Sequence, residues 1–526
     1  MKNIGILSLC VVSLFGQVTA ERLLKADLEP GNWLTYSGGY HGHRFSQLEE
    51  INRDNIRKLK LKWVHQMRTL EKVETTPLVV DGVMYVTRPP NDVFALDAET
   101  GRPFWSYVRS LPEKINVCCG QVNRGLAMLG NRLYMGTVDA HLVALDAKTG
   151  AVIWDVEVAD RTKGYSVTVA PLAVRDKIIV GIAGGEYGIR GFVDAYDAAT
   201  GKRVWRFHTV PAPGEPGSAT WKGDAWKTGG GSTWVTGSYD PQLNLVYWGT
   251  GNASPDWNGD VRPGDNLYTA SVVALSLDTG KLKWHFQFTP HDVHDYDAVQ
   301  IPVLVDAEYQ GRQRKLMYWA NRNAFFYVLD RATGEFLRAT PFAKQTWAER
   351  IDEKGRPVPK AGSDPTREGT LVYPGVQGGT NWYSPSFNPR TGLFYLSVWE
   401  YASKYYSGDA PYVAGNRFLG SLPVDPPGDP GWGAVRAIQP RTGEIAWEYK
   451  LHTKPQAGIL STAGNVVFGG TNEGQFFALD SKTGTELWRT NLGGVIAAGP
   501  VSYLSNSKQQ ITIAAGSALF TFGVEE

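Results

Sequence analysis

Two histidines and three aspartates are concentrated in the stretch His291–Gln300, which reads HDVHDYDAVQ. If Asp295–Asp297 is extended, alternation with period two places both carboxylates on one side and Tyr296 on the other. Crowded carboxylates repel each other, so such a pair usually holds a cation or shares a proton. A polar turn with solvated acids explains the same residues about equally well, because acid clusters are only probabilistic markers of a site. The rest of the chain has to decide between the two.

The few cysteines limit which disulfide bonds and haem attachments the chain can form. Apart from Cys10, the only cysteines are the neighbours Cys118 and Cys119. In an oxidising compartment they can pair with each other, although a disulfide between neighbours closes a small strained ring, and two buried free thiols are the alternative. No C-x-x-C-H motif occurs, so we expect no attached c-type haem.

The N-terminus has the three parts of a secretory signal peptide. Lys2 gives a basic start, residues 4–15 are apolar, and Val18-Thr19-Ala20 supplies small residues for cleavage. The apolar run is too short to span a bilayer permanently. We therefore expect residues 1–20 to be a signal peptide that exports a soluble protein to the periplasm.

The composition limits the class of binding partner and the class of fold. A net charge of +1 argues against a nucleic-acid partner. The 18 Trp and 59 Gly residues indicate many short strands with tight turns.

A unit of strand, Gly-ended turn and tryptophan recurs along the chain. In one copy, Ala95-Leu96-Asp97 is followed by Thr100-Gly101 and then by Trp105. The copies end, in chain order, at Trp63, Trp105, Trp154, Trp205, Trp284, Arg338, Trp447 and Trp488. Hairpins repeated with a period of about forty to fifty residues predict a β-propeller. We therefore predict an all-β, eight-bladed propeller that occupies residues 21–526 as a single domain.

The ends of the repeat predict how the ring closes. The strand around Trp63 lacks its partners, so Ile511–Phe522 should be an outer or closing strand that completes its blade. Closure between the chain ends removes two exposed sheet edges. The long gaps after Trp205 and Arg338 require insertions, which we expect on one face, around the mouth of the channel. Helical periodicity is nearly absent, and Leu48–Leu59 is the best candidate for a short helix.

Several motifs between these repeats resemble those of the quinoprotein alcohol dehydrogenases, a family that includes methanol dehydrogenase and uses pyrroloquinoline quinone (PQQ). The resemblance extends from about Trp33 to the end of the chain. The motifs are VCCGQVNRG (117–125), GGEYGIRG (184–191), GGGSTW (229–234), WGTGN (248–252), HDYDA (294–298), ANRN (320–323) and GGTNW (378–382). The resemblance implies oxidation of a primary alcohol, or of an aldehyde, by hydride transfer to metal-bound PQQ in the propeller channel.

The resemblance also implies which residues contact PQQ, a flat tricarboxylate quinone. A Cys118–Cys119 disulfide would cover one face and Trp234 the other, and the fork of Arg124 suits a carboxylate. Further contacts are implied for Glu74, Thr168, Gly184, Gly185, Ser232, Asn381 and Trp382. Taken alone, Trp234 is more often a packed core residue and Arg124 half of a surface ion pair.

For the metal, Glu186, Asn252 and Asp295 match the positions that hold or flank it, and their oxygens are hard donors. Asp295 is implied as general base, and Arg322 as the group that stabilises negative charge on the quinone oxygens. Asp297 stands where lanthanide-dependent members of the family have an Asp and calcium enzymes a small residue. Three carboxylates match a trivalent ion, so a lanthanide is favoured over calcium. An Asp297 that points into solvent or caps a turn is the alternative.

Some positions depart from the family pattern. Ala183 replaces a frequent serine, Gln456 stands where methanol dehydrogenase has a tryptophan, and the sequence stops at Glu526 soon after the last strand. These departures leave the shape of the substrate pocket open. Electrons should pass to a separate c-type cytochrome, and a homodimer remains an open alternative to a monomer.

Three other functions compete with this interpretation. A non-catalytic exported scaffold is the main one, since fold alone does not give function, but a scaffold does not need the predicted site residues together. A nicotinamide dehydrogenase lacks the strand–GxGxxG–helix unit. A zinc hydrolase built on His291 and His294 lacks a third clear ligand.

Overall fold

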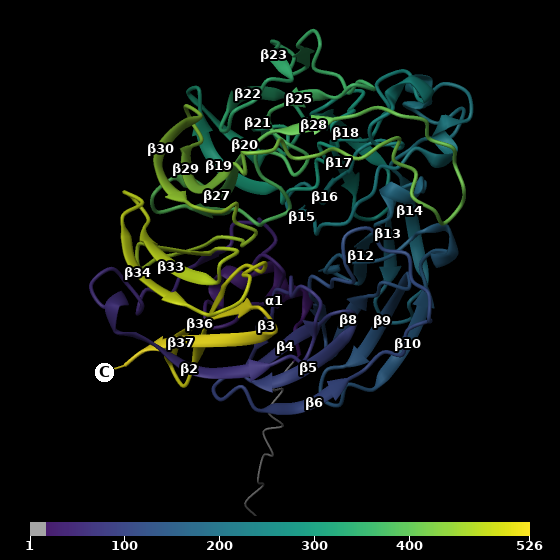
Figure 1. The fold of residues 1–526 in the computed structure, drawn as a ribbon. Coiled ribbons are helices and arrows are strands. Elements are labelled where there is room, and N and C mark those ends of the chain that lie inside the picture. Colours follow the sequence, from purple (N-terminus) through teal and green to yellow (C-terminus); the bar gives the residue numbers. More distant parts are fainter. Residues whose placement is uncertain (1–16, 526) are drawn as a thin grey trace, which may run out of the picture.

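Residues 17–525 of the 526-residue chain are described in a computed structural model, and they form a ring of β-sheets around a central axis (Figure 1). In this part of the chain eight sheets of four or five strands follow one another around the ring. The prediction of an eight-bladed propeller is therefore confirmed. The predicted signal peptide falls mainly on residues 1–16, outside the described residues. Between residues 17 and 525, no helix has both the length and the apolar character needed to cross a membrane.

Each blade is a meander of four antiparallel strands, ordered from the innermost strand to the outermost. The blades are β3 (Leu78–Val80), β4 (Val83–Arg88), β5 (Asp92–Asp97) and β6 (Pro103–Tyr107); β7 (Ala127–Leu129), β8 (Arg132–Gly136), β9 (His141–Asp146) and β10 (Val152–Glu157); β11 (Leu172–Val174), β12 (Lys177–Gly181), β13 (Phe192–Asp197) and β14 (Arg203–His208); β15 (Ser238–Asp240), β16 (Leu245–Gly249), β17 (Ser271–Ser276) and β18 (Leu282–Gln287); β19 (Val303–Tyr309), β20 (Arg312–Ala320), β21 (Phe325–Asp330) and β22 (Phe336–Pro341); β26 (Ser386–Asn388), β27 (Leu393–Glu400), β29 (Trp432–Gln439) and β30 (Glu444–Leu451); β31 (Leu460–Thr462), β32 (Val466–Gly470), β33 (Gln475–Asp480) and β34 (Glu486–Asn491); and β35 (Val501–Ser505), β36 (Lys508–Ala515), β37 (Ala518–Val524) and β2 (Leu59–Gln66).

The remaining elements are short. The strand β1 (Phe45–Ser46) adds to β31 in parallel, and two small sheets pair β23 (Ala348–Ile351) with β24 (Pro357–Pro359) and β25 (Thr370–Val372) with β28 (Ser403–Tyr405). The helical segments are α1 (Ala20–Leu24) and the 3-10 turns η1 (Ala26–Leu28), η2 (Ile56–Lys58), η3 (Arg161–Lys163), η4 (Gly185–Tyr187), η5 (Ser218–Thr220), η6 (Ala225–Thr228) and η7 (Gly259–Val261).

Burial of the strands follows from their place in the blade. Every residue of β16 is buried, because neighbouring blades cover both faces of a middle strand, and its sequence LVYWG is accordingly a continuous apolar run. The outer strand β10, by contrast, alternates exposed and partly buried residues. The core therefore lies between the blades.

The repeated tryptophans join each blade to the next. Trp105 donates a hydrogen bond from Nε1 to the Ala147 carbonyl at 3.2 Å, and its ring covers Gly150 in the turn of the following blade. Gly150 has a positive φ, and a Cβ there would lie 2.5 Å from the Trp105 ring, so both the turn and the contact require glycine. At the exceptional position, Arg338 donates instead to the Thr442 carbonyl at 3.0 Å. The Trp and Gly of the repeat are thus two halves of one contact between blades.

The ring closes between the chain ends, as predicted. The strand β2 pairs with β37, and Trp63 lies opposite Thr521 (Figure 1). The prediction that Ile511–Phe522 is one strand is wrong, because a turn at Gly516, which has a positive φ, divides it into β36 and β37.

The predicted helix Leu48–Leu59 is also wrong, since only the single turn η2 forms there. Asn52 accepts the N–H groups of Asp54 and Asn55 at 3.0 and 3.4 Å, while Asn55 accepts the N–H of Asn52 at 2.9 Å. These short side chains satisfy the backbone locally and so compete with a helix.

The strand order determines which loops share a face. In an antiparallel meander, the loops between the second and third strands emerge on the same side as those that lead from the fourth strand into the next blade. The long connections β14–β15, β16–β17, β22–β26 and β27–β29 all belong to these two classes. The insertions therefore gather on one face of the ring, as predicted.

Candidate active site

A cavity of about 530 Å³ opens among these loops. It brings together residues from loops of many blades. The predicted site residues that line it are Glu74, Cys118, Cys119, Arg124, Thr168, Gly184, Glu186, Trp234, Asp295, Asp297, Arg322, Asn381 and Trp382. Residues more than three hundred positions apart in the sequence thus face one space.

The remaining predicted residues, Gly185, Ser232 and Asn252, pack directly against this lining. A Cβ on Gly185 would lie 3.3 Å from Ser232 Oγ and 3.8 Å from Asn252 Oδ1. A Cβ on Gly251 would lie only 2.5 Å from Asp297 Oδ1, so glycine is required for the two loops to approach each other.

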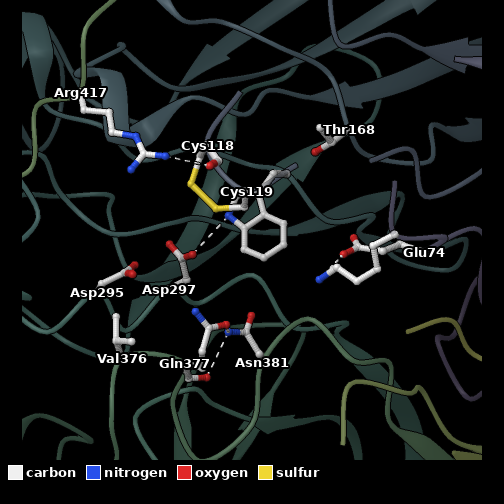
Figure 2. Close-up of a disulfide and its surroundings, with 12 residues drawn as sticks. Glu74, Cys118, Cys119, Thr168, Asp295, Asp297, Val376, Gln377, Asn381 and Arg417 are labelled. Carbon is white, nitrogen blue, oxygen red and sulfur yellow. Dashed lines mark hydrogen bonds and ion pairs between the residues drawn. A yellow bond between two sulfur atoms is a disulfide. The ribbon is translucent and has the colours of Figure 1, made fainter. Parts of the chain in front are cut away.

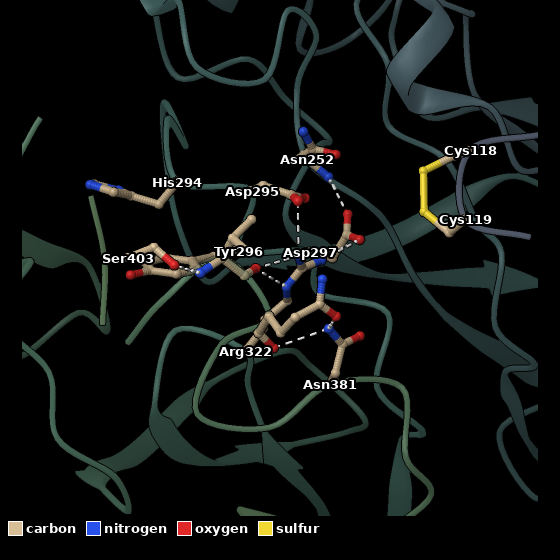
Figure 3. Close-up of polar contacts among 12 residues, drawn as sticks. Cys118, Cys119, Asn252, His294, Asp295, Tyr296, Asp297, Arg322, Asn381 and Ser403 are labelled. Carbon is tan, nitrogen blue, oxygen red and sulfur yellow. Dashed lines mark hydrogen bonds and ion pairs between the residues drawn. A yellow bond between two sulfur atoms is a disulfide. The ribbon is translucent and has the colours of Figure 1, made fainter. Parts of the chain in front are cut away.

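The acids Asp295 and Asp297 bind the same guanidinium (Figure 3). Arg322 donates from Nη2 to Asp295 Oδ2 and from Nη1 to Asp297 Oδ2, both at 2.8 Å. Asp297 also accepts the backbone N–H of Asn252 at 2.7 Å and the indole N–H of Trp234 at 3.2 Å. The Asp297 side chain is 7% exposed and that of Asp295 is 18% exposed. Asp297 is therefore held by more hydrogen bonds than Asp295, and the Asp295 side chain is the more exposed of the two in the cavity.

The two carboxylates lie on one side, but not for the reason inferred from the sequence. Asp295 has a φ of +62°, so the segment is not regularly extended. Tyr296 points away as predicted, and its hydroxyl donates to the Pro374 carbonyl at 2.7 Å. The local turn and Arg322 together, rather than strand alternation, bring the acids to one side.

The other members of the acid and histidine stretch shape the loop. Asp292 accepts the N–H groups of His294 and Tyr296 at 3.0 and 2.6 Å. His294 contacts the Ser363 carbonyl at 2.8 Å, and His291 contacts the Gly264 carbonyl at 2.8 Å. These three residues therefore hold the turn that presents Asp295 and Asp297.

Two more acids complete an acidic end of the cavity, which we define as Glu186, Asp256, Asp295 and Asp297. A carboxylate oxygen of Glu186 lies within 4.8 Å of both sulfurs of Cys118 and Cys119. Asp256, which sequence reasoning missed, is 1% exposed and also lines the cavity. No spacing rule distinguishes an acid four residues after Asn252, so the sequence carried no signal for it.

Removal from bulk water raises the pKa of each of these four carboxyls, because it disfavours the charged form. Neighbouring carboxylates raise the pKa of Asp256 and Asp295 further, and Arg322 opposes the rise at Asp295. For Arg322, burial alone would lower the pKa, but Asp295 and Asp297 raise it above its usual value. The four carboxyl groups have one guanidinium, that of Arg322, to balance their negative charge, and a bound cation would supply the missing positive charge.

The opposite, basic end consists of Lys72 and Arg124 around Glu74. Arg124 lies 2.7 Å from one Glu74 oxygen, Lys72 lies 3.1 Å from the other, and Arg124 also donates to Thr168 Oγ1 at 3.0 Å. Lys72, which was not predicted, donates to Gln456 Oε1 at 3.1 Å. Two cations for one carboxylate leave net positive charge, which fits an anionic group.

The walls between the two ends are flat. Cys118 and Cys119 form the predicted disulfide, and Arg417 donates to the Cys118 carbonyl at 3.2 Å (Figure 2). The Arg124 guanidinium lies 4.8 Å from the centre of the Trp234 ring and 4.7 Å from that of Trp382. Disulfide, indole rings and charged ends form a donor set that fits a flat polycarboxylate such as PQQ together with a hard metal ion.

Other contacts differ in detail from those expected. Gly184 has a φ of +120°, and a Cβ there would meet the Gly164 carbonyl rather than the cavity. Asn381 donates to the Gln377 carbonyl at 3.0 Å and caps the backbone N–H of Trp382 at 2.8 Å, so it shapes its own loop.

Comparison with known proteins extends these observations. A family model described as "Glucose/ethanol/alcohol dehydrogenase, beta-propeller domain" matches residues 33–341, and one described as "Outer membrane protein assembly factor BamB" matches residues 432–515. Quinohemoprotein alcohol dehydrogenase ADH IIB of Pseudomonas putida is 41% identical over 97% of this chain and 78% of its own length. Lanthanide-dependent methanol dehydrogenase of Methylacidiphilum fumariolicum is 38% identical over 93% of this chain and 85% of its own. The solved structure of a europium-containing methanol dehydrogenase superposes with a TM-score of 0.91 at 34% identity, covering 96% of this chain and 100% of that one. Each of these three matches covers more than nine-tenths of this chain.

Proposed function

We propose that this chain, which belongs to the PQQ-dependent quinoprotein alcohol dehydrogenases, oxidises primary alcohols in the cavity described above. The observation that carries the proposal is the meeting of Asp295, Arg322 and the Cys118–Cys119 disulfide in one cavity with an acidic and a basic end. A non-catalytic scaffold needs none of these groups, so that alternative is not favoured. The BamB match covers only blade strands near the C-terminus.

The geometry supports Asp295 as the base. Its Oδ2 accepts a hydrogen bond from Arg322. The Asp295 side chain is more exposed than that of Asp297, so its Oδ1 is available to accept the hydroxyl proton of an alcohol. Bound PQQ would supply the two-electron acceptor, and a bound metal would polarise its carbonyl. Arg322 lies where it can stabilise negative charge beside Asp295 while it keeps the carboxylate oriented.

We assign the metal to Glu186, Asn252, Asp295 and Asp297, and favour a lanthanide over calcium. Asp297 is buried at the cavity and does not point into solvent. Its Oδ2 already accepts two hydrogen bonds, but Oδ1 accepts only the N–H of Asn252 and keeps a lone pair for a ligand bond. The excess of carboxylates favours a trivalent ion, and two of the similar proteins above carry a lanthanide in their names.

The basic end would receive carboxylates of the cofactor. Arg124 and Lys72 supply the charge, and Trp234 faces the ring across from the disulfide. The other proposed cofactor contacts are Glu74, Thr168, Gly184, Gly185, Ser232, Asn381 and Trp382. Gln456 binds Lys72 and thereby places an amide at this end of the cavity.

Export and electron transfer complete the proposal. We infer that residues 1–20 direct the chain to the periplasm, that residues 21–526 act as one propeller domain, and that electrons leave to a separate c-type cytochrome. The chain contains no C-x-x-C-H haem motif of its own.

The test is reconstitution of the purified mature protein with PQQ and either lanthanum or calcium. Binding should change the PQQ absorbance spectrum, and a panel of primary alcohols should then reduce an artificial dye. A protein that binds PQQ and metal but oxidises no alcohol or aldehyde would contradict the proposal.

A further inference from the structure

Among residues 17–525, the carboxylate of Asp256 is buried and forms no ion pair. It lies in the β16–β17 loop, four residues after Asn252, where it is 1% exposed and lines the cavity. Its Oδ1 atom is fully buried and has no hydrogen-bond partner among residues 17–525. A buried carboxylate oxygen without a partner is unfavourable unless the group is protonated or a cation compensates it.

The nearest buried guanidinium does not provide that compensation. Arg262 donates to the Pro255 carbonyl at 3.0 Å and to Asn266 Oδ1 at 2.9 Å. Its Nη2 donates to the backbone carbonyls of Asp256 at 3.3 Å and Asp292 at 2.6 Å. Arg262 therefore ties together the backbones of the two acid-bearing loops and does not form an ion pair with the Asp256 carboxylate.

These contacts hold the two acid-bearing loops next to each other. One loop carries Asn252 and Asp256, the other carries Asp295 and Asp297, and Arg262 fixes their separation. The loops also meet where Asp297 accepts the Asn252 N–H at 2.7 Å. The Asp256 carboxylate also interacts with the Asn252 side chain, so it lies beside a proposed metal ligand while its Oδ1 has no hydrogen-bond partner. A bound cation would compensate this buried oxygen.

We propose that Asp256 is a further ligand of the metal, so that four carboxylates, not three, surround the ion. The inference rests on the proposed function, because it concerns the same metal. Four negative charges beside Arg322 balance a trivalent ion, whereas a divalent ion leaves an excess of negative charge. Asp256 therefore increases the preference for lanthanides over calcium, since the number of ligand charges tunes affinity for hard cations.

The experiment measures metal binding rather than turnover. The mature chain, purified without PQQ, is loaded with Eu³⁺, and luminescence lifetimes in H₂O and D₂O give the number of water molecules on the ion. In Asp256→Ala, about one additional water should occupy the vacated ligand position. Affinity for Tb³⁺ should fall by about tenfold or more, and affinity for Ca²⁺ should fall less.

The matched control is Asp260→Asn, which removes an exposed carboxylate from the same loop. It should leave the hydration number unchanged and the Tb³⁺ affinity within about twofold. A second variant, Asp256→Asn, should raise the melting temperature of the metal-free protein, because it removes a buried uncompensated charge. A purely structural role for Asp256 predicts a lower melting temperature instead.

Each outcome decides between a ligand and a structural residue. If Asp256→Ala matches the wild type in both hydration number and Tb³⁺ affinity, Asp256 is not a ligand, while the proposed function stands. If the wild-type chain binds neither Tb³⁺ nor Ca²⁺, the proposal of a metal site is wrong, and so is the proposal that Asp256 is a metal ligand.

Discussion

The two ends of the cavity treat charge in opposite ways. At the basic end, Glu74 lies 2.7 Å from Arg124 and 3.1 Å from Lys72, so most of the charge is paired within the protein. At the acidic end, which comprises Glu186, Asp256, Asp295 and Asp297, residues 17–525 supply a single cation that pairs with these acids, Arg322. The basic end therefore keeps one positive charge in excess, whereas the acidic end keeps three negative charges that a cation would balance.

The difference indicates where ligand binding supplies the most energy. Repulsion and loss of water raise the pKa of all four acids, and a metal would remove this penalty. The basic end carries a smaller excess of charge, so a ligand that binds there relieves less electrostatic repulsion. We therefore expect substitutions at the acidic end to change activity and metal response strongly, and those at the basic end to change mainly the affinity for the cofactor.

The largest effect should come from Asp295→Asn, because the amide cannot accept the alcohol proton. Turnover should fall by roughly a hundredfold to ten-thousandfold, as is typical for loss of a general base. PQQ binding and melting temperature should change little, since the substitution is nearly isosteric. Normal turnover by the variant with PQQ and metal bound would show that Asp295 is not the base.

Asp297→Ala should separate the two metals. It removes a charged ligand and leaves the Trp234 N–H and part of Arg322 unpaired, so lanthanum-supported activity should be abolished. Affinity for lanthanum should fall by about tenfold or more. Dye reduction with lanthanum or calcium as the only added metal measures this. Full activity of the wild type with calcium alone, unaffected by the substitution, would assign Asp297 a purely structural role.

At the basic end, Arg124→Lys keeps the charge but loses the planar fork that contacts Glu74 and Thr168 together. The affinity for PQQ should fall by roughly tenfold to a hundredfold, as expected for hydrogen bonds to a charged group. Titration of the metal-loaded protein with PQQ measures the change, and turnover at saturating PQQ should remain close to normal. A large loss of turnover at saturating PQQ would contradict the prediction that the basic end affects mainly cofactor affinity.

Lys72→Met tests the outer part of the same end. The Lys72 side chain is 38% exposed, so solvent screens its charge. We expect a loss of PQQ affinity of about fivefold or less, as for other exposed ion pairs. The same titration at low and high salt should show the loss shrinking as salt is added. An effect as large as that of Arg124→Lys would mean that Lys72 becomes buried when PQQ binds.

The smallest effect is a pH dependence of stability in metal-free protein. A carboxyl whose pKa is raised in the folded state binds its proton more tightly there, so its stabilising effect is lost as pH rises through that raised pKa. The melting temperature of chelated protein should therefore fall as pH rises above about 4, the ordinary carboxyl range. Metal-loaded protein should lack this slope, and Asp256→Asn should reduce it. A melting temperature of the chelated wild type that does not change with pH would contradict the raised pKa values at the acidic end.

The sequence alone determined the propeller, because each blade is local. A strand, a Gly-ended turn and a Trp are encoded within one short stretch of adjacent residues, as from Ala95 to Trp105. The contact between Trp105 and Gly150 shows how the Trp of one unit packs on the turn of the next blade. Pairing of the Trp63 strand with the C-terminal segment also followed, because an unpaired edge at one end requires a partner at the other. Local reasoning failed where side chains compete with the backbone, as at Asn52 and Asn55.

For the site, the sequence supplied most of the residues through family motifs, but not their balance of charge. Asp256 and Lys72 carry no motif, and only the meeting of loops from different blades places them at opposite ends of one cavity. The shared orientation of Asp295 and Asp297 likewise depends on Arg322 and on a positive φ rather than on strand alternation. Charge compensation is a property of groups brought together across the ring, and for that reason only the tertiary structure decided it.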